Sequence, residues 1–243
     1  MATHDRDPDG VRRVRAPNPS PMTLDGTNTY VVAGWVVDPG PAEEGHIEAV
    51  EAAAGGAIEG VVLTHSHPDH SEAAAPLAER AGGVPIVLPD GGAQVGPFRA
   101  IATPGHSPDH VCLLLGRLCF AGDTVMGRGS VFIPPGEGSL ASYLDSLRVL
   151  LELDLEVLCP GHGPYVRDPR AKLREYLEHR LERERLLLDA LEGGARSEGE
   201  LIRRAWSDAP AALYAATSLT LRAHLEKLAL EGRLPDDLET GLL

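Results

Sequence analysis

The sequence predicts an α/β domain followed by a small helical region. Between residues 29 and 88, short apolar strands alternate with helical segments, which is the pattern of a layered α/β fold. Between residues 98 and 120, three apolar runs are separated by turns and indicate short adjacent strands. From residue 170 onward, apolar residues recur at helical spacing. We therefore divide the chain into a domain of residues 1–169 and a helical domain of residues 170–243.

The elements of the first domain are expected in this order. Strands at 11–15, 29–32 and 35–37 precede a break at Asp38-Pro39-Gly40-Pro41, and a helix at 47–54 follows. A buried strand at 60–64, an alanine-rich helix at 71–81 and a strand at 86–88 come next. Strands at 98–102, 111–115 and 118–120 include a hairpin at Gly116-Arg117. A helix at 139–151 and a strand at 156–159 complete the domain.

The second domain is expected to be helical throughout most of its length. Apolar residues mark one face of a long helix over 170–191, which Gly193-Gly194 ends. Ser197 and Glu200 form a candidate capping box for a second helix that runs to about residue 206. Pro210 suits the start of a third helix, and residues 218–231 form a fourth that Gly232 closes.

Composition indicates a cytoplasmic globular protein of 243 residues. Its formal net charge of -14 disfavours a polyanionic partner, although bound cations would change the local charge at a site. No apolar run approaches the roughly 20 residues of a membrane span, and no signal peptide is expected. The three cysteines form no CxxC motif and are expected to be reduced. We expect no membrane partner, and we leave the oligomeric state open with a homodimer as one option.

The segment HSHPDH, residues 65–70, is the strongest chemical signal in the chain. It places three imidazoles and one carboxylate directly after an apolar run. These are the ligand types that suit zinc and related divalent ions. The alternative, a polar loop that happens to be rich in histidine, would be preferred for a lone histidine and not for this cluster.

Three later loops repeat this arrangement of a ligand after an apolar strand. They are TPGHSPDH at 103–110, AGDT at 121–124 and PGHGP at 160–164. Each loop alone is an ordinary turn sequence. Together with HSHPDH, and in this order, the loops predict one metal centre.

With these motifs, the chain resembles the metallo-β-lactamase-fold hydrolases over residues 11 to 170. The resemblance implies an αββα sandwich and two metal ions, with zinc expected and iron or manganese as alternatives. It implies a first site made by His65, His67 and His106, a second made by Asp69, His70 and His162, and Asp123 bridging the two. The spacing agrees, since His65 and His67 project in the same direction from an extended segment while Pro68 turns the next two ligands away.

Two metal ions about 3.5 to 4 Å apart can share and activate a hydroxide. We therefore expect a dinuclear zinc-dependent hydrolase in which a metal-bridging hydroxide, held by the catalytic carboxylates Asp69 and Asp123, attacks an ester, thioester, lactone or phosphodiester. His110, four residues after His106, is a candidate catalytic proton donor, and a structural role is an equal alternative.

A more detailed resemblance points to the β-lactamase-like protein 2 group. It rests on the segment 18–30, which includes GTNTY, on TPGHSPDH, and on the long helix before a helical tail. It implies a winged-helix-like C-terminal domain and makes single-stranded RNA an alternative substrate to a small ester or thioester. Asn28 and Tyr30 become candidate substrate-binding residues, although a packing role for Tyr30 is favoured.

The charges of the tail disfavour RNA without excluding it. Residues 170–243 carry 12 basic and 14 acidic side chains, and the helix at 218–231 has no basic face. In the long helix, Arg180, Arg183 and Arg185 alternate with glutamates and predict a solvated surface of ion pairs. Arg174 and Arg180 could still face a phosphate. A glyoxalase II-type thioesterase and a metal-containing nucleic-acid-binding protein without catalysis remain as further alternatives.

Overall fold

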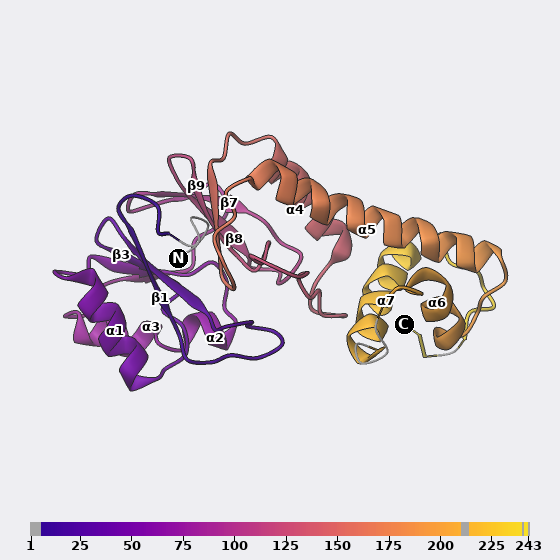
Figure 1. The fold of residues 1–243 in the computed structure, drawn as a ribbon, viewed down its shortest axis with the longest axis horizontal. Coiled ribbons are helices and arrows are strands. Elements are labelled where there is room, and N and C mark those ends of the chain that lie inside the picture. Colours follow the sequence, from indigo (N-terminus) through magenta and orange to yellow (C-terminus); the bar gives the residue numbers. More distant parts are fainter. Residues whose placement is uncertain (1–5, 210–213, 240, 243) are drawn as a thin grey trace.

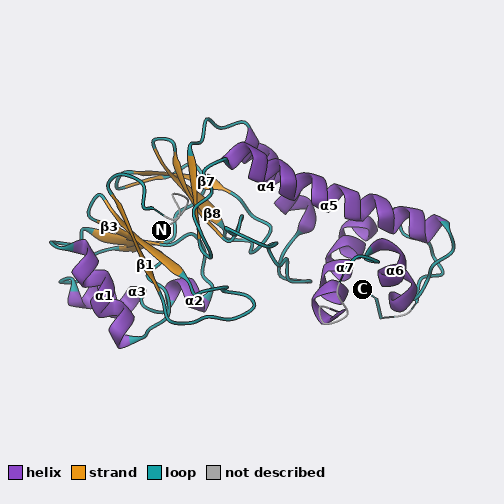
Figure 2. Ribbon diagram, viewed as in Figure 1, coloured by secondary structure: helices purple, strands orange, loops and turns teal. Residues whose placement is uncertain are grey.

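The computed structural model describes residues 6–209, 214–239 and 241–242. Two five-stranded sheets form the centre of the first domain (Figures 1 and 2). The first sheet has the order β1 (Val11–Arg15), β2 (Asn28–Val32), β3 (Trp35–Val37), β4 (Gly60–Val62) and β5 (Ile86–Val87). The second has the order β10 (Val157–Pro160), β9 (Leu118–Gly122), β8 (Val111–Leu115), β7 (Phe98–Ala102) and β6 (Gln94–Val95).

The two sheets pack face to face, and side chains alternate between their two faces. Val37 and Val62 point into the space between the sheets, where they meet Phe98, Leu113 and Phe120 of the second sheet. Their sequence neighbours Val36 and Val61 point the other way, toward α1 (Glu44–Ala54) and α3 (Ala74–Arg80). The outer face of the second sheet packs against α4 (Leu140–Leu151) and the start of α5 (Pro169–Glu192). The expected αββα sandwich is confirmed.

The C-terminal helices form a separate apolar cluster at the far end of α5. Helix α5 runs from its place beside α4 out to α6 (Glu198–Ala205) and α7 (Tyr214–Leu230), as Figure 1 shows. The predicted capping box of Ser197 and Glu200 is present at the start of α6. The helix expected to begin at Pro210 lies outside the described residues, and α7 begins four residues before the predicted 218.

Within the described residues that follow α7, the chain contains turns and no strand, so a wing is not part of the described structure. None of the described helices is both long and apolar enough to cross a bilayer.

Two local predictions were wrong. Helix α2 (Pro68–Ser71) begins inside the histidine motif, because proline at the first helical position needs no N–H partner. Asp69 and His70 therefore lie in a helical turn, whereas the sequence suggested a loop. On α5, Arg180 and Glu184 are buried, at 4% and 8% exposure, where a solvated surface was expected. Outer pairs on this helix, such as Arg185 with Glu182, are exposed as predicted.

Candidate metal centre

The ligand residues predicted from the sequence meet at one edge of the sandwich. Each follows the carboxyl end of a strand: the HSHPDH segment follows β4, His106 follows β7, Asp123 follows β9 and His162 follows β10. Main-chain hydrogen bonds join these loops, from Val111 N to the Thr64 carbonyl at 2.8 Å and from Gly161 N to the Gly122 carbonyl at 2.8 Å. The edge is therefore a continuous scaffold that both sheets build.

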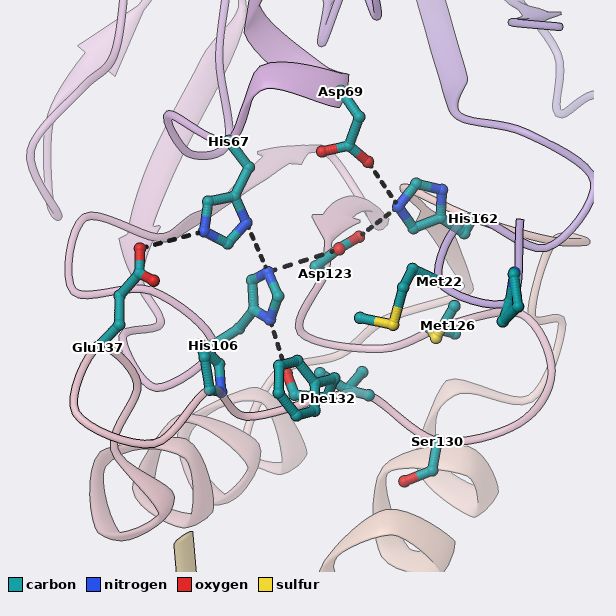
Figure 3. Close-up of a pocket in the computed structure, with 13 residues that line it drawn as sticks. Met22, His67, Asp69, His106, Asp123, Met126, Ser130, Phe132, Glu137 and His162 are labelled. Atoms are coloured by element: carbon teal, nitrogen blue, oxygen red, sulfur yellow. Dashed lines mark hydrogen bonds and ion pairs between the residues drawn. The ribbon is translucent and has the colours of Figure 1, made fainter. Parts of the chain in front are cut away.

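The ring nitrogens and carboxylate oxygens converge on one small space (Figure 3). His106 Nε2 lies 2.9 Å from His67 Nδ1, and His162 Nε2 lies 3.3 Å from His70 Nε2. Asp123 lies between these two pairs, with Oδ2 at 3.6 Å from His106 Nε2 and Oδ1 at 3.3 Å from His162 Nε2. Asp69 Oδ2 lies 3.4 Å from His162 Nε2.

Each of four histidines is held by its outward ring nitrogen. His70 donates from Nδ1 to Asp38 Oδ2 at 3.0 Å, and His106 donates from Nδ1 to the Phe132 carbonyl at 2.8 Å. Since the Thr64 hydroxyl donates to Asp38, it accepts from His65 Nδ1 at 3.0 Å. The outward partners are Thr64 for His65, Glu137 for His67 at 3.5 Å, Asp38 for His70 and Phe132 for His106. In the neutral rings of His65, His70 and His106, the hydrogen therefore lies on the outward nitrogen, and the inward nitrogen is the one that can bind a metal ion.

Several buried atoms lack the partner that a metal ion would supply. His65 Nε2 and Asp123 Oδ1 are buried and make no hydrogen bond. The donor atoms of His65, His67 and His106 lie within 4.8 Å of one another, as do those of Asp69, His70 and His162. A Cβ on Gly161 would lie 2.5 Å from His70 Cε1 and 2.6 Å from Asp123 Oδ1, so glycine is needed beside this space. The donor set fits bound divalent cations.

The electrostatics also favour cations. Burial opposes ionisation of Asp123, but the neighbouring His162 and His70 outweigh it and hold the pKa of this carboxyl well below its usual range. Burial likewise opposes protonation of His162, but Asp123 and Asp69 raise its pKa to about 9. Burial also opposes ionisation of Asp69, but His162 and His70 lower the pKa of this carboxyl too. Two ionised carboxylates thus lie beside the inward nitrogens, and they stabilise positive charge in the space between them.

His110 does not line the cavity in which these groups lie. Its Nε2 accepts from the Asp123 backbone N–H at 3.1 Å, so Nδ1 carries the hydrogen and donates to Thr103 Oγ1 at 2.9 Å. Burial lowers the pKa of its imidazole to about 3. The contacts therefore place a neutral His110 behind Asp123, where it orients the loop that carries the carboxylate.

Asn28 and Tyr30 lie behind the loop that carries His162. Asn28 Nδ2 donates to the carbonyls of Pro160 at 2.9 Å and Gly163 at 2.8 Å, and the Tyr30 hydroxyl donates to the same Pro160 carbonyl at 2.7 Å. Both side chains are buried, and neither lines the cavity. Their contacts hold the loop of His162 in place. The packing role favoured for Tyr30 agrees with these contacts, and the suggested contact of Asn28 with substrate stays a prediction.

Three supporting residues were missed from the sequence. Asp38 directly follows strand β3, just as each ligand segment follows a strand. The same sequence pattern could therefore have predicted that Asp38 belongs to the site. Asp109 joins two ligand loops, because it accepts from Ser66 N at 3.0 Å and Ser107 Oγ at 2.7 Å. Glu137 contacts His67 from a loop that is distant in the sequence, and no local sequence pattern predicts this contact.

The cavity above the ligands is apolar on its opposite wall. It encloses about 280 Å³, and its floor contains His67, Asp69, His106, Asp123 and His162. The wall is formed by Pro21, Met22, Met126, Val131, Phe132 and Pro134. Figure 3 shows Met22 and Met126 beside the ligand cluster, and Met22 is 53% exposed. The cavity thus combines a polar floor with an adaptable apolar wall.

Known proteins resemble this chain in sequence. Residues 22–99 and 85–162 match the sequence model of the metallo-beta-lactamase superfamily. A beta-lactamase-like protein 2 homolog of Caenorhabditis elegans is 30% identical over 92% of this chain and 85% of its own length. An atrochrysone carboxyl ACP thioesterase of Aspergillus chevalieri is 33% identical over 74% of this chain and 65% of its own.

A solved structure supports the same relationship. A metallo-beta-lactamase family protein of Thermus thermophilus superposes with a TM-score of 0.69 at 26% identity, over 92% of this chain and 94% of its own. Sequence and structure therefore agree that this chain belongs to the metallo-beta-lactamase superfamily.

Proposed function

We propose that this chain is a dinuclear zinc-dependent hydrolase that cleaves esters or thioesters with an apolar acyl group. The observation that carries the proposal is the cavity itself, in which five of the seven converging histidine and aspartate side chains form the floor opposite an apolar wall. The thioesterase of Aspergillus chevalieri, which resembles this chain, supports the choice of bond.

His65, His67 and His106 would hold one ion, Asp69, His70 and His162 the other, and Asp123 would contact both. All of these donors are nitrogen or oxygen atoms, which suit zinc, and iron or manganese could use the same set. The ions would supply Lewis-acid polarisation of a carbonyl and activation of water near neutral pH.

The chain's own residues fix this chemistry in place. Asp38 holds His70 directly and His65 through Thr64, so one buried carboxylate orients a ligand of each proposed site. His110 holds the backbone of Asp123. Side chains locked by such contacts lose little freedom when substrate binds, which favours a reactive geometry.

Charge at the cavity argues against a polyanionic substrate. No arginine or lysine is among the described residues that line it, and the rim carries Glu137 beside the floor carboxylates. Arg180, which the sequence left as a candidate for a phosphate, is buried and donates to the Ser130 hydroxyl and the Val131 carbonyl. A small acyl substrate therefore fits the cavity better than single-stranded RNA does.

The test is an activity panel with metal-replete and chelator-treated protein. Aryl and coenzyme A thioesters of increasing acyl length, lactones, bis(p-nitrophenyl) phosphate and labelled single-stranded RNA are assayed with zinc, iron or manganese. We expect chelator-sensitive turnover of thioesters or esters that improves with apolar acyl length. RNA cleavage without ester turnover would support the endoribonuclease, and turnover unaffected by chelation or by Asp69→Asn would contradict the mechanism.

A further inference from the structure

The loop between β9 and α4 is both a wall of the cavity and a partner of two proposed ligands. We call residues 126–138 the cavity loop. Its Phe132 carbonyl accepts from His106 Nδ1 at 2.8 Å, and its Glu137 carboxylate lies 3.5 Å from His67 Nε2. Residues 126–138 contain neither helix nor strand. The position of this loop therefore affects the orientation of both histidines, although it has no regular structure of its own.

The C-terminal helices hold the cavity loop from its other side. Arg180 of α5 donates from Nη2 to Ser130 Oγ at 3.1 Å and to the Val131 carbonyl. Tyr176, one turn earlier on the same helix, donates its hydroxyl to the Gly129 carbonyl at 2.8 Å. From α7, Glu226 accepts from Gly136 N at 3.3 Å. These contacts connect the helical domain to the loop that holds the ligands.

An arginine is unusual at a buried position such as that of Arg180 if its side chain only packs between helices. Its side chain is buried, and no carboxylate among the described residues forms an ion pair with it. Burying a guanidinium without a counter-charge costs several kcal/mol unless its N–H groups are hydrogen-bonded. Its Nη2 donates to two acceptors of the cavity loop, its Nε is buried without a hydrogen-bond partner, and the Tyr143 ring lies 5.8 Å from its Cζ. The cavity loop therefore supplies the hydrogen bonds that this buried cation makes in the described structure.

We propose that Arg180 is a positioning residue for the metal centre. It fixes Ser130 and Val131 from helix α5, so that the adjacent Phe132 carbonyl holds the His106 ring in its ligating orientation. The C-terminal helical domain thereby sets the metal affinity and the width of the cavity. The proposal rests on the proposed metal site, and it does not depend on which bond the protein cleaves.

Two matched substitutions on α5 separate this role from general stabilisation of the helices. Arg180→Met keeps the apolar stem and removes the guanidinium. Arg183→Met makes the same change three residues later, where the guanidinium instead binds Asp208 at 2.7 and 2.6 Å and the Ala205 carbonyl of α6 at 2.8 Å. Arg183 makes no hydrogen bond or ion pair with the cavity loop in the described structure, so it serves as the control.

The readouts require no substrate. In metal-free protein, hydrogen exchange of peptides covering 126–138 should become about tenfold faster in Arg180→Met and stay unchanged in Arg183→Met. Zinc titration should show a dissociation constant about tenfold higher only in Arg180→Met, at the low end of the effect of losing a direct partner of a ligand. The visible spectrum of cobalt-loaded protein should change in the same variant, since it reports ligand geometry.

Unchanged exchange and zinc affinity in a folded Arg180→Met protein would overturn the proposal, as would equal effects of the two substitutions. If Arg180→Met does not fold, Arg180→Lys decides, because it retains the buried charge but lacks the guanidinium fork. We expect exchange about threefold faster there, and wild-type exchange would overturn the proposal. A failure to hydrolyse any ester would affect only the proposed function.

Discussion

Histidines are buried in both domains of this molecule, and their surroundings differ. At the edge of the sandwich, His65, His70 and His106 each donate a hydrogen bond from one ring nitrogen to a protein oxygen, and the other ring nitrogen points toward Asp123. In the helical domain, His224 is fully buried, neither of its ring nitrogens is hydrogen-bonded, and its ring packs 5.8 Å from that of Trp206. Burial alone therefore does not mark a site, whereas convergent nitrogens with fixed outer partners do.

Charged groups show the same difference. In the helical domain, Glu184 is closed off by Lys227 at 2.8 Å and by Arg233 at 3.4 Å. At the sandwich edge, no lysine or arginine among the described residues pairs with Asp123, and the nitrogens nearest its Oδ1 belong to His162 at 3.3 Å and His70 at 3.5 Å. The buried glutamate of the helical domain is thus paired with cationic side chains, whereas the aspartate at the sandwich edge points into the space shared by the histidines.

The largest expected effect is on turnover. Asp123→Asn keeps the shape of the side chain and removes the charge that would contact both metal ions. We expect kcat/KM to fall at least about 1,000-fold, which corresponds to about 4 kcal/mol of transition-state stabilisation. His224→Leu is the control, because it alters a buried imidazole of the other domain. An equal loss of kcat/KM in both variants would contradict the assignment of the active site to the sandwich edge.

The second effect is on metal affinity. Asp38→Asn removes the carboxylate that orients His70 directly and His65 through Thr64. We expect zinc affinity to fall by up to about 100-fold, as is typical when an outer partner of a ligand is lost. Competition with a chromogenic chelator measures it, and wild-type affinity would show that the outer contacts do not control the ligands.

The third effect is on stability around His162. Asn28→Ala leaves the buried carbonyls of Pro160 and Gly163 without the amide that now donates to them. We expect the free energy of unfolding to fall by about 2 kcal/mol in urea titrations of metal-free protein. Tyr30→Phe removes one donor to the same loop and should cost about 1 kcal/mol. If both variants keep wild-type stability but bind substrate more weakly, the substrate-contact role predicted from the sequence would replace this account.

The smallest effect is in the helical domain and depends on pH. Burial, with nearby Arg180 and Lys227, lowers the pKa of His224 to about 3, whereas the unfolded value is about 6.5. As pH falls, the unfolded chain therefore binds a proton at this residue before the folded chain does. The contribution of His224 to the free energy of unfolding is lost as pH falls from about 6.5 toward 3. Urea titrations should show that His224→Leu changes stability by less than about 1 kcal/mol at pH 7, and that it gains about 1 kcal/mol relative to wild type at pH 5.5. A constant difference across this range would contradict a neutral His224.

The sequence predicted the ligands because each follows an apolar strand within a compact motif. Strand ends at one sheet edge meet in space, so local patterns were enough for His65, His106, Asp123 and His162. The same reasoning applied to Asp38 would have predicted it as well. The helix start at Pro68 was missed because the motif was interpreted as a loop and its proline only as a turn.

Other features depend on tertiary contacts that no local pattern reports. The charges of α5 alternate regularly, yet Arg180 and Glu184 are buried because the cavity loop and α7 cover that face. Glu137 reaches His67 across about 70 residues of sequence, and Arg180 reaches Ser130 across 50. Asn28 and Tyr30 were associated with substrate by resemblance, with a packing role favoured for Tyr30, and only the structure shows the loop that they support.

The most direct test of the central claim is anomalous diffraction at the zinc edge from crystals of metal-replete protein. The account predicts two peaks, one about 2.0–2.2 Å from nitrogens of His65, His67 and His106, and one at similar distances from Asp69, His70 and His162, with Asp123 in contact with both. A single peak that leaves one of these groups without metal, or no peak within the cluster, would contradict the dinuclear centre.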